Sequence, residues 1–471
     1  MSQWKPVPIV GGAYMDDTRP FSVQDCINYL PEQADASGTR APTMLRGLPG
    51  LTTIASSLPG WIRGIHNVEG QLFCVAGSQL CRINNDFSVT QLGQVNGVDF
   101  VGMEHNQVAG GNQLAIGTGA AGFVWDTSNS TFQQITDPGF PGTPAFVYAD
   151  SYLAGVEPQG RFWFISELAD ALSYNTLDQQ EAEAAPDLIL SLLVNHREIW
   201  AMGQRTIEPF GDTGLAPGSG GATWQPIQGV VIEQGVGSKW CSVVLDNAVL
   251  FFGNDGIFYR ADGYTLTRIS THAIEQAVRG LNWAQCFAYT WTDMGHKVAY
   301  WTFPDGHTWG FDVATSLWHR RQSYRLQRSR IACMTYWNGL WIAGDYQTGT
   351  LYKLDWSNFT EAGQPFIAER TTGVLSDNQN LMTVSGAELV MDTGRGAINN
   401  DHSVELCYSN DGGYNFTKWR PKSLGGNGKY GKRLRFWKLG SCVNRVFRIR
   451  VASPCKRDLI AASIKLDGTE S

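Results

Sequence analysis

Charged residues and long apolar runs are both scarce in this chain of 471 residues. Lys, Arg, Asp and Glu together make up only 17% of the sequence. No stretch approaches the roughly 18 uninterrupted apolar residues that suggest a transmembrane helix. The first residues, MSQWKPVPIVGG, lack the basic and then apolar layout of a secretion signal. We therefore expect a soluble protein that is made in the cytoplasm and does not insert into membranes.

The cysteines and histidines lack the spacing of metal sites. Nine cysteines occur without a C-x-x-C pair, although many zinc sites bring two cysteines together at that spacing. The odd number of cysteines also argues against a disulfide scaffold. Eight histidines are scattered, with no pair at ligand spacing. We expect reduced, mostly buried cysteines, no metal site and no cofactor.

Helical periodicity is also missing, and a strand pattern recurs in its place. Seven times an apolar run is followed by a tight turn and a second run that ends in aromatic or charged residues. The phrases begin at Leu72, Leu114, Phe162, Ile199, Val249, Ala299 and Leu340, with spacings of 42, 48, 37, 50, 50 and 41 residues. A period of about 45 residues made of strands is typical of four-stranded propeller blades.

The fold prediction is therefore an all-β protein built on a β-propeller. The blade count is six or seven, because the phrase that begins at Phe162 is the least regular. A barrel or several small sandwiches would also contain many short strands. The nearly constant period favours radial repetition over both.

The pattern divides the chain into three parts. Residues 1–60 are rich in turns and predict an irregular N-terminal arm, residues 61–373 form the propeller, and residues 374–471 form a C-terminal antiparallel β module. Insertions near 167–187 and 211–235 interrupt the propeller rhythm. The first insertion is the only stretch in which we expect helical content. Long loops in compact domains are usually functional or interfacial.

Positive charge is concentrated in the C-terminal module. Residues 401–471 carry 14 Lys and Arg against 6 Asp and Glu, although the whole chain has a net charge of −7. Alternation in KRLRFW and VFRIRV places cations on one face of each strand. We predict a partner-facing basic surface that contains Lys429, Lys432, Arg433, Arg435, Arg448 and Arg450. A protein partner is favoured over phosphate groups, and over a surface without a dedicated role.

Two motifs resemble known chemistry but indicate hairpins. Gly117, Gly119 and Gly122 spell G-x-G-x-x-G, yet the segment that follows has a strand and turn pattern, so no helix presents amides to a dinucleotide. The sequence S-x-D-x-G-x-x-F from Ser409 to Phe416 resembles the Asp box of sialidases. In those families the box stabilises a hairpin away from the active site.

Charged clusters offer weaker enzymatic candidates. Carboxylates for glycoside hydrolysis would come from Glu167, Asp170, Asp178, Glu181 and Glu183, but the sequence does not place two of them across a sugar. A second cluster, HRRQSYRLQRSR, contains Arg320, Arg321, Arg325, Arg328 and Arg330. It could clamp a carboxylate or phosphate, although an inter-blade loop that balances a negative neighbour is favoured. No nucleophile elbow or P-loop is present. The chain is predicted not to be an enzyme.

The segments between the repeats resemble one known family. CINYLPEQ, MLRGLPGLT and RGIHNVEGQLFCVAGSQLCRI follow in that order near the N-terminus. SYNTLDQQEAEAAPDLILSLLVNHREIWAMGQRTIEPFGDTG and IQGVVIEQG follow in the centre, and VELCYSNDGGYNF and FRIRVAS in the C-terminal module. Together they resemble the tail hub proteins of short-tailed bacteriophages, which are also called nozzle, head-completion or packaged-DNA-stabilisation proteins. The resemblance covers nearly the whole chain.

This resemblance implies a structural virion protein located in the phage tail and assembled in the host bacterial cytoplasm. It implies a homohexamer that forms a tube below the portal and its adaptor, the head-to-tail connector protein. The tube would retain packaged double-stranded DNA and conduct it at ejection without reading its sequence. Further implied partners are a tailspike or tail fibre on the side and a tail needle or plug at the distal end.

Electrostatics adds an expectation about the tube. Each lysine contact with phosphate adds a salt-sensitive attraction that would slow ejection, so we expect a lumen of acidic or neutral groups. The basic C-terminal module would then face neighbouring tail proteins. The alternative function is a propeller of a phage tail that binds or cleaves surface polysaccharide. A eukaryotic-type scaffold propeller is disfavoured, since no G-H or W-D signature recurs.

Overall fold

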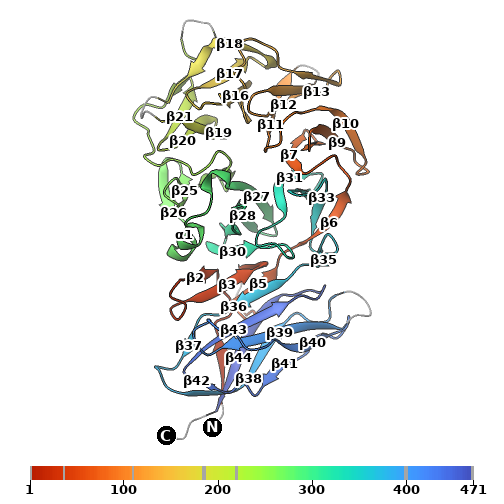
Figure 1. The fold of residues 1–471 in the computed structure, drawn as a ribbon, viewed down its shortest axis with the longest axis vertical. Coiled ribbons are helices and arrows are strands. Elements are labelled where there is room, and N and C mark those ends of the chain that lie inside the picture. The colour runs from red at the N-terminus through yellow and green to blue at the C-terminus, as the bar shows by residue number, and fades with distance from the viewer. Residues whose placement is uncertain are drawn as a thin grey trace.

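The structure is a computed structural model that is almost entirely β. It describes residues 3–34, 38–108, 111–182, 187–217, 221–396 and 401–467. Within these residues the regular helices are α1 (His272–Val278) and the short 3-10 helix η1 (Trp283–Gln285). None of the described helices is long and apolar enough to span a membrane. Figure 1 shows a propeller stacked end to end on a smaller β-sandwich.

The propeller consists of seven four-stranded antiparallel blades, six of which use consecutive strands. These six are β7–β10 (Ile62–Val68, Gln71–Ala76, Gln79–Ile83, Val89–Gln94), β11–β14 (Gly102–Val108, Gly111–Gly117, Gly122–Asp126, Thr131–Gln134), β15–β18 (Phe146–Ala149, Tyr152–Val156, Trp163–Glu167, Asp170–Gln180), β19–β22 (Ile189–Asn195, Glu198–Gly203, Ile207–Asp212, Trp224–Pro226), β23–β26 (Ser242–Leu245, Ala248–Phe252, Phe258–Asp262, Thr265–Arg268) and β27–β30 (Phe287–Asp293, His296–Thr302, Thr308–Asp312, Leu317–Arg321). The all-β propeller fold is therefore confirmed, with one blade for each repeated phrase.

The seventh blade closes the ring with a strand from the other end of the chain. It contains β31 (Ile331–Trp337), β32 (Leu340–Asp345) and β33 (Leu351–Asp355), followed by β6 (Gly50–Ala55) as the next strand outward. β6 pairs antiparallel with β33, while β31 lies against β7 of the first blade. An early strand thus completes the last blade, and backbone hydrogen bonds hold the ring shut.

The C-terminal module is a sandwich of two sheets that includes N-terminal strands. One sheet contains β1 (Gln3–Val7), β4 (Tyr29–Gln33), β5 (Thr43–Gly47), β38 (Met382–Met391), β41 (Leu434–Trp437), β42 (Ser441–Cys442) and β44 (Leu459–Asp467). The other contains β2 (Tyr14–Met15), β3 (Val23–Ile27), β36 (Ala368–Thr371), β37 (Leu375–Ser376), β39 (His402–Ser409), β40 (Arg420–Gly425) and β43 (Asn444–Val451). A small hairpin, β34 (Thr360–Glu361) and β35 (Gln364–Pro365), lies at the junction.

The two domains share one sheet and one hydrophobic core. β3 bridges β30 of the sixth blade in parallel at Ile27 and Arg320, and pairs antiparallel with β36 of the sandwich. One buried apolar cluster runs from Trp318 in the propeller to Phe447 in the sandwich. The junction seen at the waist of Figure 1 is therefore packed interior and not a flexible linker.

Two expectations differ from the structure, and two further features of the pattern are explained by it. The segment 1–60, expected to be irregular, supplies strands to both domains, because its short apolar runs find partner strands far along the chain. The stretch expected to be helical forms β18 (Asp170–Gln180), while residues 183–186 lie outside the described residues. The phrase that begins at Phe162 falls on β17 and β18, one strand later than the others, which explains its irregular spacing. The insertion near 211–235 contains β22 (Trp224–Pro226) at its centre.

Arg370 anchors the N-terminal segment in the sandwich. Its guanidinium is fully buried and donates hydrogen bonds to the carbonyl oxygens of Ile9, Gly12 and Asp25 and to the side chain of Gln24, at 2.7 to 3.2 Å. Burial lowers the pKa of Arg370. One side chain thereby satisfies backbone acceptors of the loop at Ile9 and Gly12 and of β3 at Asp25.

We predict that Arg370→Met lowers the free energy of unfolding by about 3–5 kcal/mol, since several buried acceptors lose their donor at once. Urea unfolding of the full chain, followed by tryptophan fluorescence, measures this change. The control is Arg433→Met, which removes an arginine whose side chain is 66% exposed and should cost less than about 1 kcal/mol. Equal effects of the two substitutions would show that Arg370 does not anchor the segment.

Candidate interaction surface

The predicted basic residues lie on two different sheets of the sandwich. Arg435 is on β41, and Arg448 and Arg450 are on β43. Leu434 and Phe436 of β41 and Phe447, Ile449 and Val451 of β43 are buried in the shared core. The alternating cations therefore point away from the core on opposite faces of the sandwich. The structure does not bring the predicted residues together into one patch.

Glutamates on neighbouring strands pair with most of these arginines. Glu388 of β38 contacts Arg433 at 3.0 Å and Arg435 at 2.7 Å. On the other sheet Arg450 lies 2.7 Å from Glu405, and Arg448 lies 3.3 Å from Glu369. Burial raises the pKa of Glu369, although Arg448 acts in the opposite direction. Much of the positive charge is thus neutralised by glutamates on the outer faces of the sandwich itself.

Aromatic rings hold two of the arginines in place. The guanidinium of Arg448 lies 3.9 Å from the ring centroid of Phe416, and that of Arg450 lies 4.1 Å from the centroid of Trp419. Such stacking contributes about 0.5–2 kcal/mol. Both arginines are therefore structural parts of the sheet as well as candidate partner contacts.

The two lysines extend the candidate surface in a different way. Lys429 is exposed in the turn between β40 and β41. Lys432 is half-buried, and its Nζ donates to the Ser423 hydroxyl at 2.7 Å. This turn is the part of the predicted surface where a lysine charge stands clear of the ion pairs described above.

The Asp box forms the hairpin stabiliser that its sequence predicts. The Ser409 hydroxyl donates to Asp411 at 2.5 Å and accepts from the backbone N–H of Gly413 at 2.9 Å. Hydrogen bonds from the Asn415 backbone and the Ser409 hydroxyl hold the pKa of Asp411 far below its usual range. The box lies in the connection from β39 to β40, in the sandwich and not in a blade.

The arginine-rich segment forms internal ion pairs. Arg320 contacts Asp25 at 2.8 Å, Arg321 contacts Glu361 at 3.2 Å with both side chains buried, and Arg330 contacts Asp345 at 2.9 Å. Arg328 stacks 3.9 Å from the ring centroid of Tyr346. The interpretation that these arginines balance negative neighbours is confirmed for the three pairs. Two of them join the sixth blade to N-terminal and junction strands.

The remaining motifs show no catalytic arrangement among the described residues. The G-x-G-x-x-G sequence is the turn from β12 to β13, with Gly119 at a positive φ of 94°, so it is a hairpin as expected. Asp170 lies at the start of β18 and accepts a hydrogen bond from the Ser173 hydroxyl. Asp178 lies further along the same strand. Glu183 lies outside the described residues.

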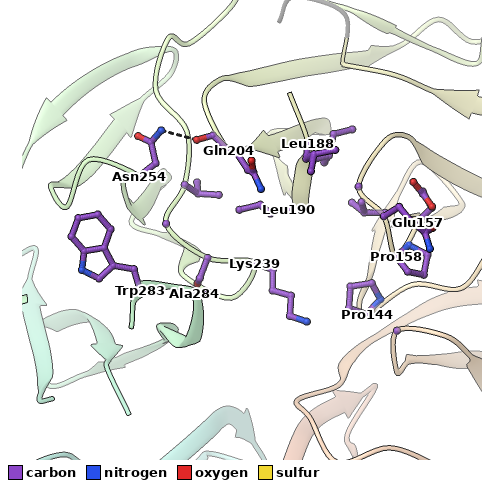
Figure 2. A pocket seen from close by; sticks show the side chains of 18 of the residues that line it. Pro144, Glu157, Pro158, Leu188, Leu190, Gln204, Lys239, Asn254, Trp283 and Ala284 are labelled. Carbon is purple, nitrogen blue, oxygen red and sulfur yellow. Dashed lines mark hydrogen bonds between the residues drawn. The ribbon is translucent and has the colours of Figure 1, made fainter. Parts of the chain in front are cut away.

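A cavity with a volume of about 820 Å³ lies on the propeller. Its apolar wall includes Pro144, Pro158 and Leu190, while Lys239 and Asn254 contribute polar groups (Figure 2). Glu157 is the one carboxylate among the described lining residues, and its oxygen accepts the Arg161 backbone N–H at 2.9 Å. Hydrolysis of a glycoside by the usual route needs two carboxylates that face one bond. The cavity has the size of a ligand pocket but lacks that pair.

Comparison with known families identifies the chain. The family model "Bacteriophage P22 Gp10, beta-propeller" matches residues 5–358, and "Bacteriophage P22 Gp10, beta-sandwich" matches residues 368–467. This chain belongs to the P22 Gp10 family. The family comprises phage structural proteins, the head-completion or tail hub proteins of short-tailed phages. The resemblance found in the sequence is confirmed, and the virion is the location that the family indicates.

Solved structures that resemble this chain do so only remotely in sequence, as two examples show. Among curated protein sequences, none is significantly similar to this chain. Virginiamycin B lyase from Staphylococcus aureus is 10% identical, with a TM-score of 0.45, over 64% of this chain and 98% of the lyase. The β-propeller domain of Cps50 (Swd1) from Myceliophteria thermophila is 8% identical, with a TM-score of 0.43, over 64% of this chain and 98% of that domain. Similarity at this level carries no information on function.

We predict that Arg450→Ala lowers the free energy of unfolding by about 1–2 kcal/mol, because it removes both an ion pair and a stacked ring contact. Lys429→Ala is the matched control and should change stability by less than about 0.5 kcal/mol. Chemical unfolding of the two variants and the parent measures the difference. If both variants were as stable as the parent, Arg450 would be free for a partner and not part of the sheet.

Proposed function

We propose that this chain is the structural subunit of a phage tail hub, six copies of which form a tube below the portal and adaptor rings. The observation that carries the proposal is the match of the two P22 Gp10 family models to nearly the whole chain. The tube retains packaged DNA, conducts it at ejection, and carries a tailspike or fibre and a needle or plug. The chain has no enzymatic role in this proposal.

The architecture supports a mechanical role. The sheet that runs through β30, β3 and β36 makes propeller and sandwich one body, so force applied to one domain reaches the other without bending a linker. Buried pairs such as Arg321 and Glu361 reinforce this junction. A subunit that contacts head proteins at one end and tail appendages at the other benefits from such stiffness.

The distribution of charge supports a proposal for which surface faces a partner protein and which faces the DNA. The ion-paired arginines contribute little net attraction for DNA, since their charge is balanced locally. The lysine turn near Lys429 and Lys432 faces a neighbouring tail protein in this proposal, and the lumen is lined by acidic or neutral groups. The phosphates of the DNA then meet few cations in the lumen. The DNA therefore lacks the attraction from counterion release that would slow its passage through a basic channel.

A polysaccharide-binding or polysaccharide-cleaving propeller is the second candidate. Its support is the cavity of about 820 Å³, whose lining includes Trp283, Gln204, Asn254 and Lys239 (Figure 2). Aromatic and amide side chains suit a sugar, and the single carboxylate Glu157 favours binding over cleavage.

We expect the purified chain and its adaptor ring to form six-fold tubes in negative-stain images. Isolated monomers under the same conditions, together with binding of host polysaccharide that is lost on Trp283→Ala, would instead support the second candidate. Both measurements use the full chain, so neither depends on separating the domains.

The charge assignment has its own test. The double variant Lys429→Glu and Lys432→Glu should reduce co-sedimentation with neighbouring tail proteins at least about tenfold, because charge reversal at a complementary rim costs more than 1 kcal/mol. The matched control, Lys429→Arg and Lys432→Arg, keeps the charge and should bind normally. Normal tail assembly with faster or slower DNA ejection in the Glu variant would place these lysines in the lumen and contradict the assignment.

A further inference from the structure

Three side chains from two neighbouring blades converge at the inner side of the propeller. His66 lies on β7 of the first blade, and Glu104 and His105 lie on β11 of the second. The Nε2 atom of His66 is 2.9 Å from Nδ1 of His105. The Oε1 atom of Glu104 is 3.5 Å from that His66 nitrogen and 3.3 Å from that His105 nitrogen. Two nitrogens and one oxygen thus form a compact triangle.

The triangle has the dimensions of one face of a metal coordination tetrahedron. Zinc binds imidazole nitrogen and carboxylate oxygen at about 2.0–2.2 Å, so two ligand atoms in a tetrahedral site are about 3.3–3.5 Å apart. Two sides of the triangle already match this length. Only the distance between Nε2 of His66 and Nδ1 of His105 must increase, by about half an ångström. Small rotations of the two rings are enough for this change. A pair of histidines and one glutamate is a ligand set that zinc accepts in proteins.

The surroundings shift the pKa of two of the three groups. Burial lowers the pKa of His66, and His105 lowers it further, whereas Glu104 acts in the opposite direction. Burial alone would raise the pKa of Glu104, but hydrogen bonding with His105 and attraction to His66 outweigh it and leave the pKa lowered. Neutral imidazole and ionised carboxylate are the states that coordinate a metal.

The scaffold presents the groups on rigid elements with access to solvent. β7 and β11 are paired to the second strands of their own blades and lie against each other. The side chains of His66, His105 and Glu104 are 20%, 23% and 30% exposed. The Glu104 carboxylate also accepts the His105 backbone N–H at 3.0 Å, which fixes its orientation. An ion can therefore enter, and one coordination position remains for water.

We propose that His66, Glu104 and His105 form a binding site for a divalent transition-metal ion of the zinc type. The bound ion would link the inner strands of the first two blades. The first blade also borders the seam where β31 of the seventh blade lies against β7, so the ion would reinforce the ring close to its point of closure. Its role would be structural, because the ligands come from strands of two blades that lie against each other. The alternative interpretation is that the imidazoles of His66 and His105 form only a hydrogen bond.

Cobalt provides a direct test on the full chain, without a histidine tag and after dialysis against EDTA. One equivalent of Co²⁺ per chain should give visible absorption bands of a four- or five-coordinate site, and one equivalent of Zn²⁺ should remove them. Zn²⁺ should also raise the thermal unfolding temperature, since a ligand that binds only the folded state stabilises it. His105→Gln should weaken binding at least about 100-fold, because losing a ligand costs more than losing an outer-shell partner.

The controls separate a metal site from general effects. His272→Gln changes a histidine on α1 whose side chain is 74% exposed, and it should bind Co²⁺ as the parent does. If His105→Gln folds poorly, Glu104→Gln keeps the shape of the side chain and should lose the bands while its circular dichroism stays that of the parent. Absence of visible bands in the parent, or equal binding by the parent and the cluster variants, would leave only the hydrogen-bonded histidine pair and overturn the proposal.

Discussion

The structure depends on the pairing of one early segment, residues 3–55, with both domains at once. β1, β3, β4 and β5 complete the sandwich, and β6 completes the seventh blade. A propeller closed by its own last strand would need no such help, and the sandwich would lack strands from both of its sheets. Because a single stretch of backbone satisfies both demands, neither domain is complete by itself. The continuous core that joins them follows from the same arrangement.

Arginine provides much of the polar reinforcement at this junction. Arg320 and Arg321 tie the sixth blade to Asp25 and Glu361, and Arg370 holds the turn region that precedes β3. A guanidinium can bind several buried acceptors at once because it offers five donors in a plane and stays charged when buried. On the outer faces of the sandwich, other arginines pair with glutamates and stack on rings. Net charge therefore overstates how much positive potential the module presents to a partner.

The propeller could be predicted from the sequence because each blade repeats a local pattern of strand, turn and strand. Neither the neutralised basic surface nor the histidine cluster could be predicted. Their residues meet only because strands that are distant in the sequence lie side by side. Glu388, Glu369 and Glu405 neutralise the basic strands, but Glu369 and Glu388 precede the window of high positive charge, and Glu405 lies near its start. His66 and His105 likewise show no ligand spacing, since adjacent blades bring them together. The N-terminal strands looked irregular because their partners lie near the opposite end of the chain.

The position of β6 and its neighbours constrains how the chain can fold during synthesis. Strands that leave the ribosome first must wait for β33 and β44, which are made late. Until then the early strands have unpaired edges, and the growing row of blades cannot close. Contacts between distant segments slow folding and prolong the exposure of apolar surface. The ring can therefore be completed only after β33 has been translated, and the sandwich only after β44, near the end of the chain. A product truncated before β33 could finish neither.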